Sequence, residues 1–231
     1  MDIRKTSILP LRCLCLPDES VVNILKYLKK IKKNTCDMVE IGIDTLNKSE
    51  WESSIRTIKS TTEIPLILAA RGKKLTSKTK EIYQAAAKED WEWVDVDGRS
   101  DKKIIKDLVE KLPHSVHLIL SVHLATTPPV ATTRKWIEDM RKLGKKAPTV
   151  PKIVTTIKRS WDIFRLLQGI QEYEEKNIGI VLHGQGPESK ESRELQAIAG
   201  SSIIYLCLSE KLATGKGQWT IEAWNRRIRT L

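Results

Sequence analysis

The sequence predicts an α/β protein that folds as one (β/α)8 TIM barrel over residues 1–231. Eight short apolar segments, rich in β-branched residues, alternate with segments whose apolar residues recur at helical spacing. Strict alternation of this kind favours right-handed crossovers and a parallel sheet. Dividing 231 residues by eight gives repeats of about 29 residues, close to the size of one strand and one helix. No linker divides the chain, so we expect a single domain.

An open, doubly wound sheet is the alternative architecture for the same alternation. Dinucleotide-binding sheets of that type carry G-x-G-x-x-G after the first strand. No such motif follows the first apolar segment, and Gly184-Gln185-Gly186 lacks the third glycine and continues into Pro187. Eight repeats therefore favour the closed barrel.

The expected strands are mostly continuous apolar runs, which is typical of strands buried on both faces. They are expected at residues 8–16, 38–43, 64–70, 93–96, 116–122, 151–156, 178–182 and 203–208. The expected helices occupy residues 20–33, 49–59, 77–88, 101–111, 132–143, 160–175, 189–199 and 219–229. Ser77 is a plausible N-cap, while Pro113 and Gly144 are plausible stop signals.

The composition is that of a basic globular protein. Forty Lys+Arg against 29 Asp+Glu give a net charge of +11, and 40% hydrophobic residues exclude a disordered or collagen-like chain. Apolar runs such as 64–70 are far shorter than the roughly 20 residues that span a bilayer, so no membrane partner is expected. With one Phe, four Tyr and no finger motif, nucleic acid is not favoured as the main partner. A basic protein also attracts small anionic substrates.

The four cysteines are too few and too scattered for a disulfide framework. Cys13-x-Cys15 lies in an apolar run and is no zinc knuckle. We expect buried thiols in a reducing compartment, the cytoplasm.

Several polar residues lie within or at the end of expected strands, where a barrel places its reactive groups. Glu40 needs a partner if it is buried, Arg71 is a cation at a strand exit, and His123 and His183 end the fifth and seventh strands. An imidazole there can act as a general base near neutral pH. A structural salt bridge, an exposed loop arginine and structural histidines are the competing interpretations.

Two aspartates alternate with valines in the fourth expected strand. Asp95 and Asp97 therefore share one face. No His/Cys cluster accompanies them, so hydrogen bonding within the barrel mouth is favoured over a metal pair.

Lys152 is the most informative residue, because it lies in the apolar sixth strand. Burial is expected to lower its pKa and free the amine as a nucleophile toward ketones. The alternative is a lysine at the start of a strand whose amine reaches solvent.

With His123 on strand five and Lys152 on strand six, the pattern resembles the type I 3-dehydroquinate dehydratases of the shikimate pathway. The resemblance covers nearly the whole chain and depends on the order of several short motifs. These are Asp37-Met-Val-Glu-Ile-Gly-Ile-Asp44, Ile64-Pro-Leu-Ile-Leu-Ala-Ala-Arg71, Val94-Asp-Val-Asp97, Ser121-Val-His123 with Thr127-Pro128, Pro151-Lys-Ile153, Ser192-Arg193 and Ala213-Thr-Gly-Lys-Gly-Gln218.

The resemblance implies a Schiff base between Lys152 and the C3 ketone of 3-dehydroquinate, with His123 as general acid and base. It implies no cofactor and no metal. Arg193 would hold the substrate carboxylate, assisted by Thr214 and Gln218 from the last loop. Glu40 and Arg71 would position ring hydroxyls. A homodimer is implied by the resemblance alone.

The chain departs from the family pattern at three positions. The strand-two arginine is Gly42, the acidic residue after Arg71 is replaced near Leu75, and the acidic residue after the histidine is Leu124. We expect Asp95, Asp97 or a nearby lysine to compensate. The segment from Gly184 to Ser192 is also reshaped.

Two other functions stay open at this point. One is a class I aldolase-like lyase that forms the same imine with another substrate, which would need a phosphate site built from late loops. The other is a non-catalytic binding module that uses the basic surface.

Overall fold

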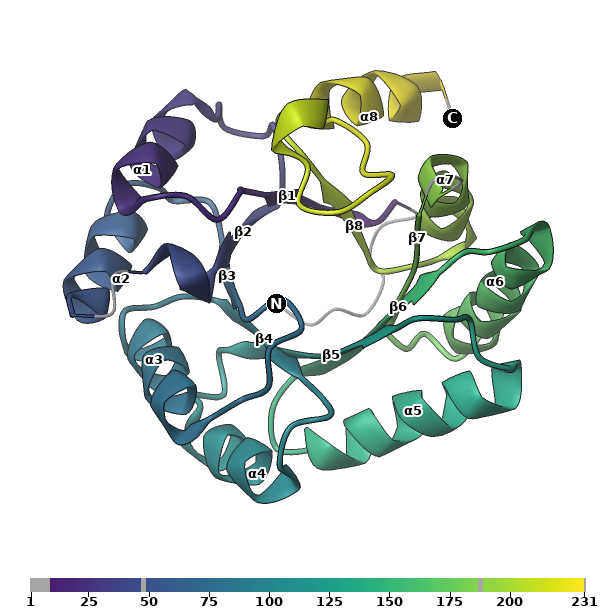
Figure 1. Ribbon diagram of the computed structural model, residues 1–231, viewed down its shortest axis with the longest axis horizontal. Helices are drawn as coiled ribbons and strands as arrows, with labels where there is room; N and C mark the ends of the chain where they lie inside the picture. The colour runs from purple at the N-terminus through teal and green to yellow at the C-terminus, as the bar shows by residue number, and fades with distance from the viewer. Residues whose placement is uncertain (1–8, 47–48, 187–188, 231) are drawn as a thin grey trace.

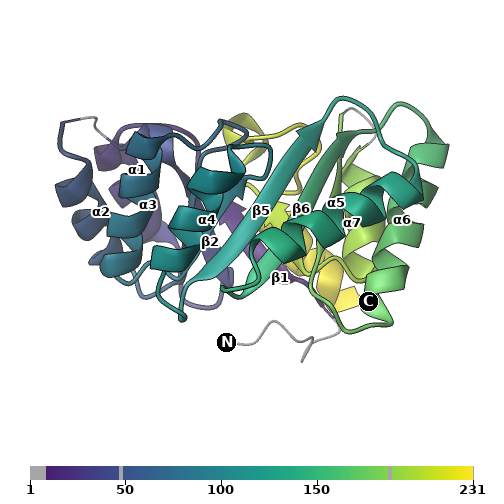
Figure 2. The same cartoon turned by 90° about the horizontal axis from the view of Figure 1, so that it is seen from below.

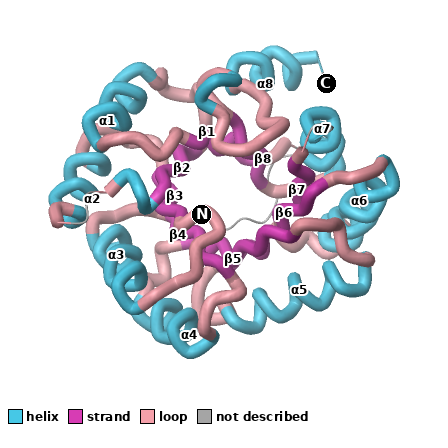
Figure 3. The backbone as a smooth tube through the Cα atoms, in the orientation of Figure 1, coloured by secondary structure: helices cyan, strands magenta, loops and turns pink. Residues whose placement is uncertain are grey.

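In the computed structural model, residues 9–46, 49–186 and 189–230 are described. Eight parallel strands form one sheet that curls into a ring, and the helices surround it (Figures 1 and 3). Seen from the side, the helices run along the outer flank of the strands (Figure 2). The predicted (β/α)8 barrel is confirmed.

The strands follow one another around the ring in sequence order, with β8 returning to β1. Their bounds are β1 Leu11–Cys15, β2 Met38–Gly42, β3 Leu66–Ala69, β4 Trp93–Asp97, β5 His117–Leu124, β6 Thr149–Thr156, β7 Val181–Gln185 and β8 Ile203–Leu206. Strands β7 and β8 share no ladder, and a backbone hydrogen bond from Ser202 N to Ile180 O (2.8 Å) bridges this seam.

A helix follows each strand and covers the outer face of the sheet. The bounds are α1 Val21–Lys30, α2 Trp51–Lys59, α3 Ser77–Lys88, α4 Lys102–Lys111, α5 Val130–Leu143, α6 Ser160–Glu174, α7 Ser189–Ala199 and α8 Ile221–Arg227. Short 3-10 turns, η1 Ile43–Thr45, η2 Glu210–Leu212 and η3 Ile228–Thr230, complete the set. Helix α3 is capped by Thr76 and not by Ser77, which is its first residue, whereas Gly144 does cap the end of α5.

The core has two parts, because each strand is buried on both faces. Outward-facing residues of the strands pack against the helices in one large cluster. Inward-facing residues fill the base of the barrel as a second cluster: Cys13, Cys15, Met38, Ile67, Trp93, Ile119, Val150, Val181, Ile203 and Tyr205. Polar inward-facing residues follow these along the strands, so the apolar plug supports the candidate site.

The expected strand positions hold, but two bounds shift in a way that matters. Strand β6 begins at Thr149 instead of 151, so Lys152 lies inside the strand and not at its start. Strand β7 begins at Val181 instead of 178, so His183 lies at its centre and Gly184 continues it. The first expected strand began at residue 8, which lies outside the described residues. All four cysteines are buried and free, as expected.

Candidate active site

An ion pair between Lys152 and Asp95 lies inside the barrel. The Lys152 amine donates to Asp95 Oδ2 at 2.8 Å and lies 3.7 Å from Glu40 Oε2, and all three side chains are almost fully buried. The Tyr205 ring lies below the amine, with 3.9 Å between Nζ and the ring centroid. Ser121 donates to the other oxygen of Asp95 at 2.5 Å. Strands β2, β4, β5, β6 and β8 therefore converge on one amine.

The expectation that burial leaves Lys152 neutral is wrong. Burial does favour the neutral amine, but the Asp95 and Glu40 carboxylates outweigh it, and the pKa of Lys152 is raised well above its ordinary value. Burial favours the neutral form of Glu40, but the charges of Lys152 and Arg71 outweigh it and lower the pKa of Glu40. Lys152 is an ammonium in the free protein, and imine formation requires that a proton leave it first.

Arg71 lies at the exit of β3 and is tied down by three partners. Its Nε donates to Glu40 at 3.0 Å, one terminal nitrogen donates to Asp18 at 2.8 Å, and the other donates to the Leu16 carbonyl at 2.6 Å. Burial opposes the charge, but Glu40 and the other acidic partners raise the Arg71 pKa. Its backbone φ of 47° is left-handed, which is strained for a non-glycine residue. Arg71 and Glu40 are therefore held in one fixed arrangement.

Gly42 explains one departure from the family pattern. A Cβ at this position would lie 1.8 Å from Asp18 Oδ1, so the Asp18 carboxylate occupies the space that a side chain at position 42 would need. Asp18, which sequence reasoning did not single out, supplies Arg71 with its second acidic partner. The absence of a side chain at position 42 is the only local signal for it. Leu75 is buried, and its backbone N donates to Ser100.

Asp97 and Asp95 face the interior as expected, but they have different partners. Asp97 forms a two-point ion pair with Arg99, with Nε–Oδ1 3.0 Å and terminal N–Oδ2 2.5 Å. Arg99 also donates to the His123 carbonyl at 3.2 Å. Arg99 thus connects the ends of β4 and β5 next to the histidine.

His123 lies on β5 beside the strand that carries Lys152. Its Cα partner on β6 is Val154, two residues after Lys152, so the three side chains share the inner face. Burial and then the Lys152 charge lower the His123 pKa, while Asp95 and Glu40 oppose this. The imidazole is therefore a neutral base at neutral pH.

Thr214 and Gln218 lie in the last loop, and Arg193 of α7 lies beside that loop. Gln218 Oε1 accepts from the Thr214 and Gly215 backbone nitrogens at 2.8 and 3.1 Å, and its amide nitrogen donates to Thr214 Oγ1 at 3.2 Å. A Cβ on Gly215 would lie 3.8 Å from the Arg193 guanidinium. Burial lowers the Arg193 pKa to about 10. A buried guanidinium beside a loop held by its own hydrogen bonds can bind a carboxylate.

Tyr205 and His183 also face the interior of the barrel. The sequence analysis gave Tyr205 no role and left the role of His183 open. The Tyr205 ring lies against the Lys152 amine. The His183 ring contacts the Tyr205 ring edge-on, with 5.2 Å between the ring centroids. Inward alternation along β8 could have placed Tyr205 in the barrel, but only the closed ring brings it to Lys152.

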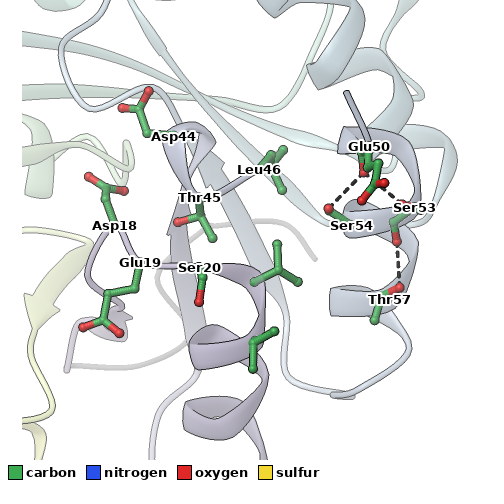
Figure 4. Close-up of a pocket in the computed structure, with 12 residues that line it drawn as sticks. Asp18, Glu19, Ser20, Asp44, Thr45, Leu46, Glu50, Ser53, Ser54 and Thr57 are labelled. Atoms are coloured by element: carbon green, nitrogen blue, oxygen red, sulfur yellow. Dashed lines mark hydrogen bonds between the residues drawn. The ribbon is translucent and has the colours of Figure 1, made fainter. Parts of the chain in front are cut away.

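Other kinds of site have little support in the described part of the chain. Within 9–46, 49–186 and 189–230, no three His, Cys, Asp or Glu side chains are grouped to hold a metal ion. Within the same ranges, every helix is too short or too polar to cross a membrane. A cavity of about 550 Å³ opens between the starts of α1 and α2 (Figure 4). Three acids on its wall already have partners, Asp18 with Arg71, Glu19 with Tyr27 and Asp44 with Lys73.

The model of the type I 3-dehydroquinase family matches residues 12–230. A 3-dehydroquinate dehydratase of Thermodesulfovibrio yellowstonii is 27% identical over 216 residues, which cover 90% of each chain. One of Pyrobaculum aerophilum is 31% identical over 130 residues, but that match spans 56% of this chain and only 40% of the relative.

Solved structures agree on the fold. The 3-dehydroquinate dehydratase of Geobacillus kaustophilus superimposes with a TM-score of 0.85 at 18% identity, covering 100% of this chain and 95% of that one. The type I enzyme of Clostridium difficile gives a TM-score of 0.84 at 20% identity, covering 96% and 92%. Because the family model spans nearly all of the sequence, the chain belongs to the type I 3-dehydroquinase family.

Proposed function

We propose that this protein dehydrates 3-dehydroquinate to 3-dehydroshikimate through a Schiff base on Lys152, with His123 as general acid and base. The observation that carries the proposal is a buried amine on β6 with an imidazole on the adjacent strand, both on the inner face of the barrel. The names of the similar proteins support the substrate. The barrel over residues 1–231 would act as one catalytic domain.

The first step is loss of a proton from the Lys152 ammonium. Asp95, at 2.8 Å, is the group placed to take it. The free amine attacks the C3 ketone to give a carbinolamine. Asp95 then returns the proton to the carbinolamine hydroxyl, which leaves as water and gives an iminium ion. The neighbouring Asp95 and Glu40 carboxylates stabilise that cation as they stabilise the ammonium. Asp95 is thus protonated only between the loss of the lysine proton and the departure of water, and it is a carboxylate again when the iminium ion forms.

The iminium ion then acidifies the hydrogens at C2. Neutral His123 takes one of them, and the electron pair moves into the enamine. The enamine expels the C1 hydroxyl, which leaves as water with the proton from His123. A second water hydrolyses the product iminium and restores Lys152. All of these steps use side chains of this chain.

The remaining site residues would orient the substrate. Arg193, held beside the Thr214–Gln218 loop, would bind the carboxylate on C1. Glu40 and Arg71, tied together at 3.0 Å, would bind ring hydroxyls. Arg71 donates through Nε and both terminal nitrogens to Glu40, Asp18 and Leu16, so substrate would enter a prearranged network.

Two experiments test the proposal together. Purified protein fed 3-dehydroquinate should produce the absorbance of the conjugated enone product. Borohydride added with substrate should trap one ligand covalently, and peptide mass spectrometry should place it on Lys152. Lys152→Ala should lose both signals, whereas Lys158→Ala, an exposed lysine just after β6, should keep both. An active wild type with an adduct elsewhere would refute the role of Lys152, and no turnover would refute the activity.

We also propose a homodimer in the cytoplasm. The family resemblance supports the dimer, and four buried free thiols are consistent with a reducing compartment. Burial raises the pKa of Cys36 to about 12 and of Cys207 to about 11, so neither is a reactive thiolate. Light scattering on the purified protein checks the dimer, since a monomer mass would contradict it.

A further inference from the structure

His183 forms a row with His123 on the inner face of the barrel. Val154 of β6 is the Cα partner of His123 on β5 and of His183 on β7. The three strands lie side by side (Figure 1). Since Lys152 lies two residues before Val154 on the same face, the two imidazoles flank the strand that carries the amine, one from each side.

The polar atoms around His183 are not satisfied within the described part of the chain. Both ring nitrogens of His183 are buried without a hydrogen-bond partner, and the same holds for Arg193 Nε and the Tyr205 hydroxyl. His183 is only 2% exposed. Buried polar atoms without partners are costly and rare, so three residues that carry them around His183 indicate a place prepared for a polar ligand.

Three charged or titrating groups of the proposed mechanism act on His183. Burial and then the charges of Arg193 and Lys152, with a smaller effect of His123, lower the His183 pKa well below its ordinary value. The ring is therefore neutral, with one N–H donor and one acceptor nitrogen. It lies within electrostatic reach of both the group proposed to bind the carboxylate and the group proposed to bind C3.

This position corresponds to one end of the substrate. The carboxylate and the departing hydroxyl are both on C1, two carbons from the C3 that would bond to Lys152. We propose that His183 donates a hydrogen bond to the C1 hydroxyl and holds it for departure. This inference rests on the proposed function. No proton is transferred from His183; the C1–O bond breaks as the enamine electrons form the C1–C2 double bond, and the proton in the released water comes from His123.

The test compares two ligands that differ at C1. 3-Dehydroquinate carries the hydroxyl, and 3-dehydroshikimate, the product, does not. His183→Met removes both ring nitrogens at similar volume. We expect kcat/KM for dehydroquinate to fall roughly tenfold, the value of one lost neutral hydrogen bond, while inhibition by dehydroshikimate stays within about twofold. His183→Gln, which keeps a donor, should recover part of the loss.

A matched control is His117→Met, because His117 is another buried histidine that stacks on Trp93 at the opposite end of β5. It should leave both constants unchanged. If His183→Met does not fold, His183→Ala, which also has no donor, replaces it, and the same contrast between the two ligands applies. Equal losses for both ligands, or no loss for dehydroquinate, would overturn the assignment. Wild-type protein without turnover would remove the proposed function itself, which is a distinct result.

Discussion

Lys152 and Asp95 form a buried ion pair at 2.8 Å that joins β6 to β4 across the barrel interior. The strands are not neighbours, since β5 lies between them. Ser121 of that middle strand fixes the second oxygen of Asp95. The pair therefore sets both the charge of the proposed nucleophile and part of the stability of the barrel.

Removing the Lys152 amine should lower the free energy of unfolding by more than the small change in side-chain volume suggests. Lys152→Met leaves the Asp95 carboxylate buried without its closest cation, which costs about 3–5 kcal/mol. Because the folded pKa of Lys152 is raised, the contribution of the pair is fully present below about pH 10.5 and is lost only as the pH rises through the raised value. Urea unfolding at pH 7 measures the full loss.

The double variant Lys152→Met/Asp95→Asn supplies the control for that experiment. With the carboxylate neutralised, we expect most of the lost free energy of unfolding to return. Equal stability of the single and double variants would show that the ion pair is not the source of the loss.

Replacing Asp95 should also change the pH at which the Lys152 amine becomes reactive. Asp95→Asn removes the strongest favourable charge on the ammonium, so the pKa of Lys152 falls. The rising limb of borohydride trapping against pH should then move to lower pH than in the wild type. Asp97→Asn is the matched control on the same strand and face, because Asp97 pairs with Arg99 instead. An unmoved limb in Asp95→Asn would contradict the role of the pair.

His123→Ala should slow the proton transfer and lower kcat by roughly 10²–10⁴-fold. In the wild type the base must be neutral, and its lowered pKa keeps it so at neutral pH. Activity should accordingly be lost only as the pH falls below the ordinary histidine value of about 6.5. Exposed His114 gives the control, since His114→Ala should leave kcat unchanged. A loss of less than tenfold in His123→Ala would assign the base elsewhere.

Gly42→Ala should act through Asp18. The new Cβ would meet Asp18 Oδ1 at 1.8 Å, and the flexible carboxylate would have to leave Arg71. We expect a small change in stability, under about 1 kcal/mol, but a several-fold rise in KM as Arg71 loses its alignment. Asp18→Ala alone should raise KM similarly, and Gly42→Ala should add little to it. Additive effects in the double variant would contradict this pathway.

The sequence determined the architecture and the identities of the central groups. Continuous apolar runs predicted the eight strands, because a strand buried on both faces has apolar residues at successive positions. Apolar residues at helical spacing predicted the eight helices. Motif order pointed to His123 and Lys152, and the alternation of Asp95 with Asp97 predicted their shared inner face. The first residues of β6 and β7 were predicted two or three positions off, since Pro151 and Ile178 are weak boundary signals.

Only the tertiary structure decided how these groups act on one another. The sequence suggested that burial would lower the pKa of Lys152, but Asp95 and Glu40, which come from distant segments, raise it. Likewise, Asp18 reaches Arg71 across 53 positions of the chain, and Tyr205 reaches Lys152 only because β8 returns to β1. Electrostatic interactions depend on distances in space, whereas a sequence pattern reports which surfaces are buried.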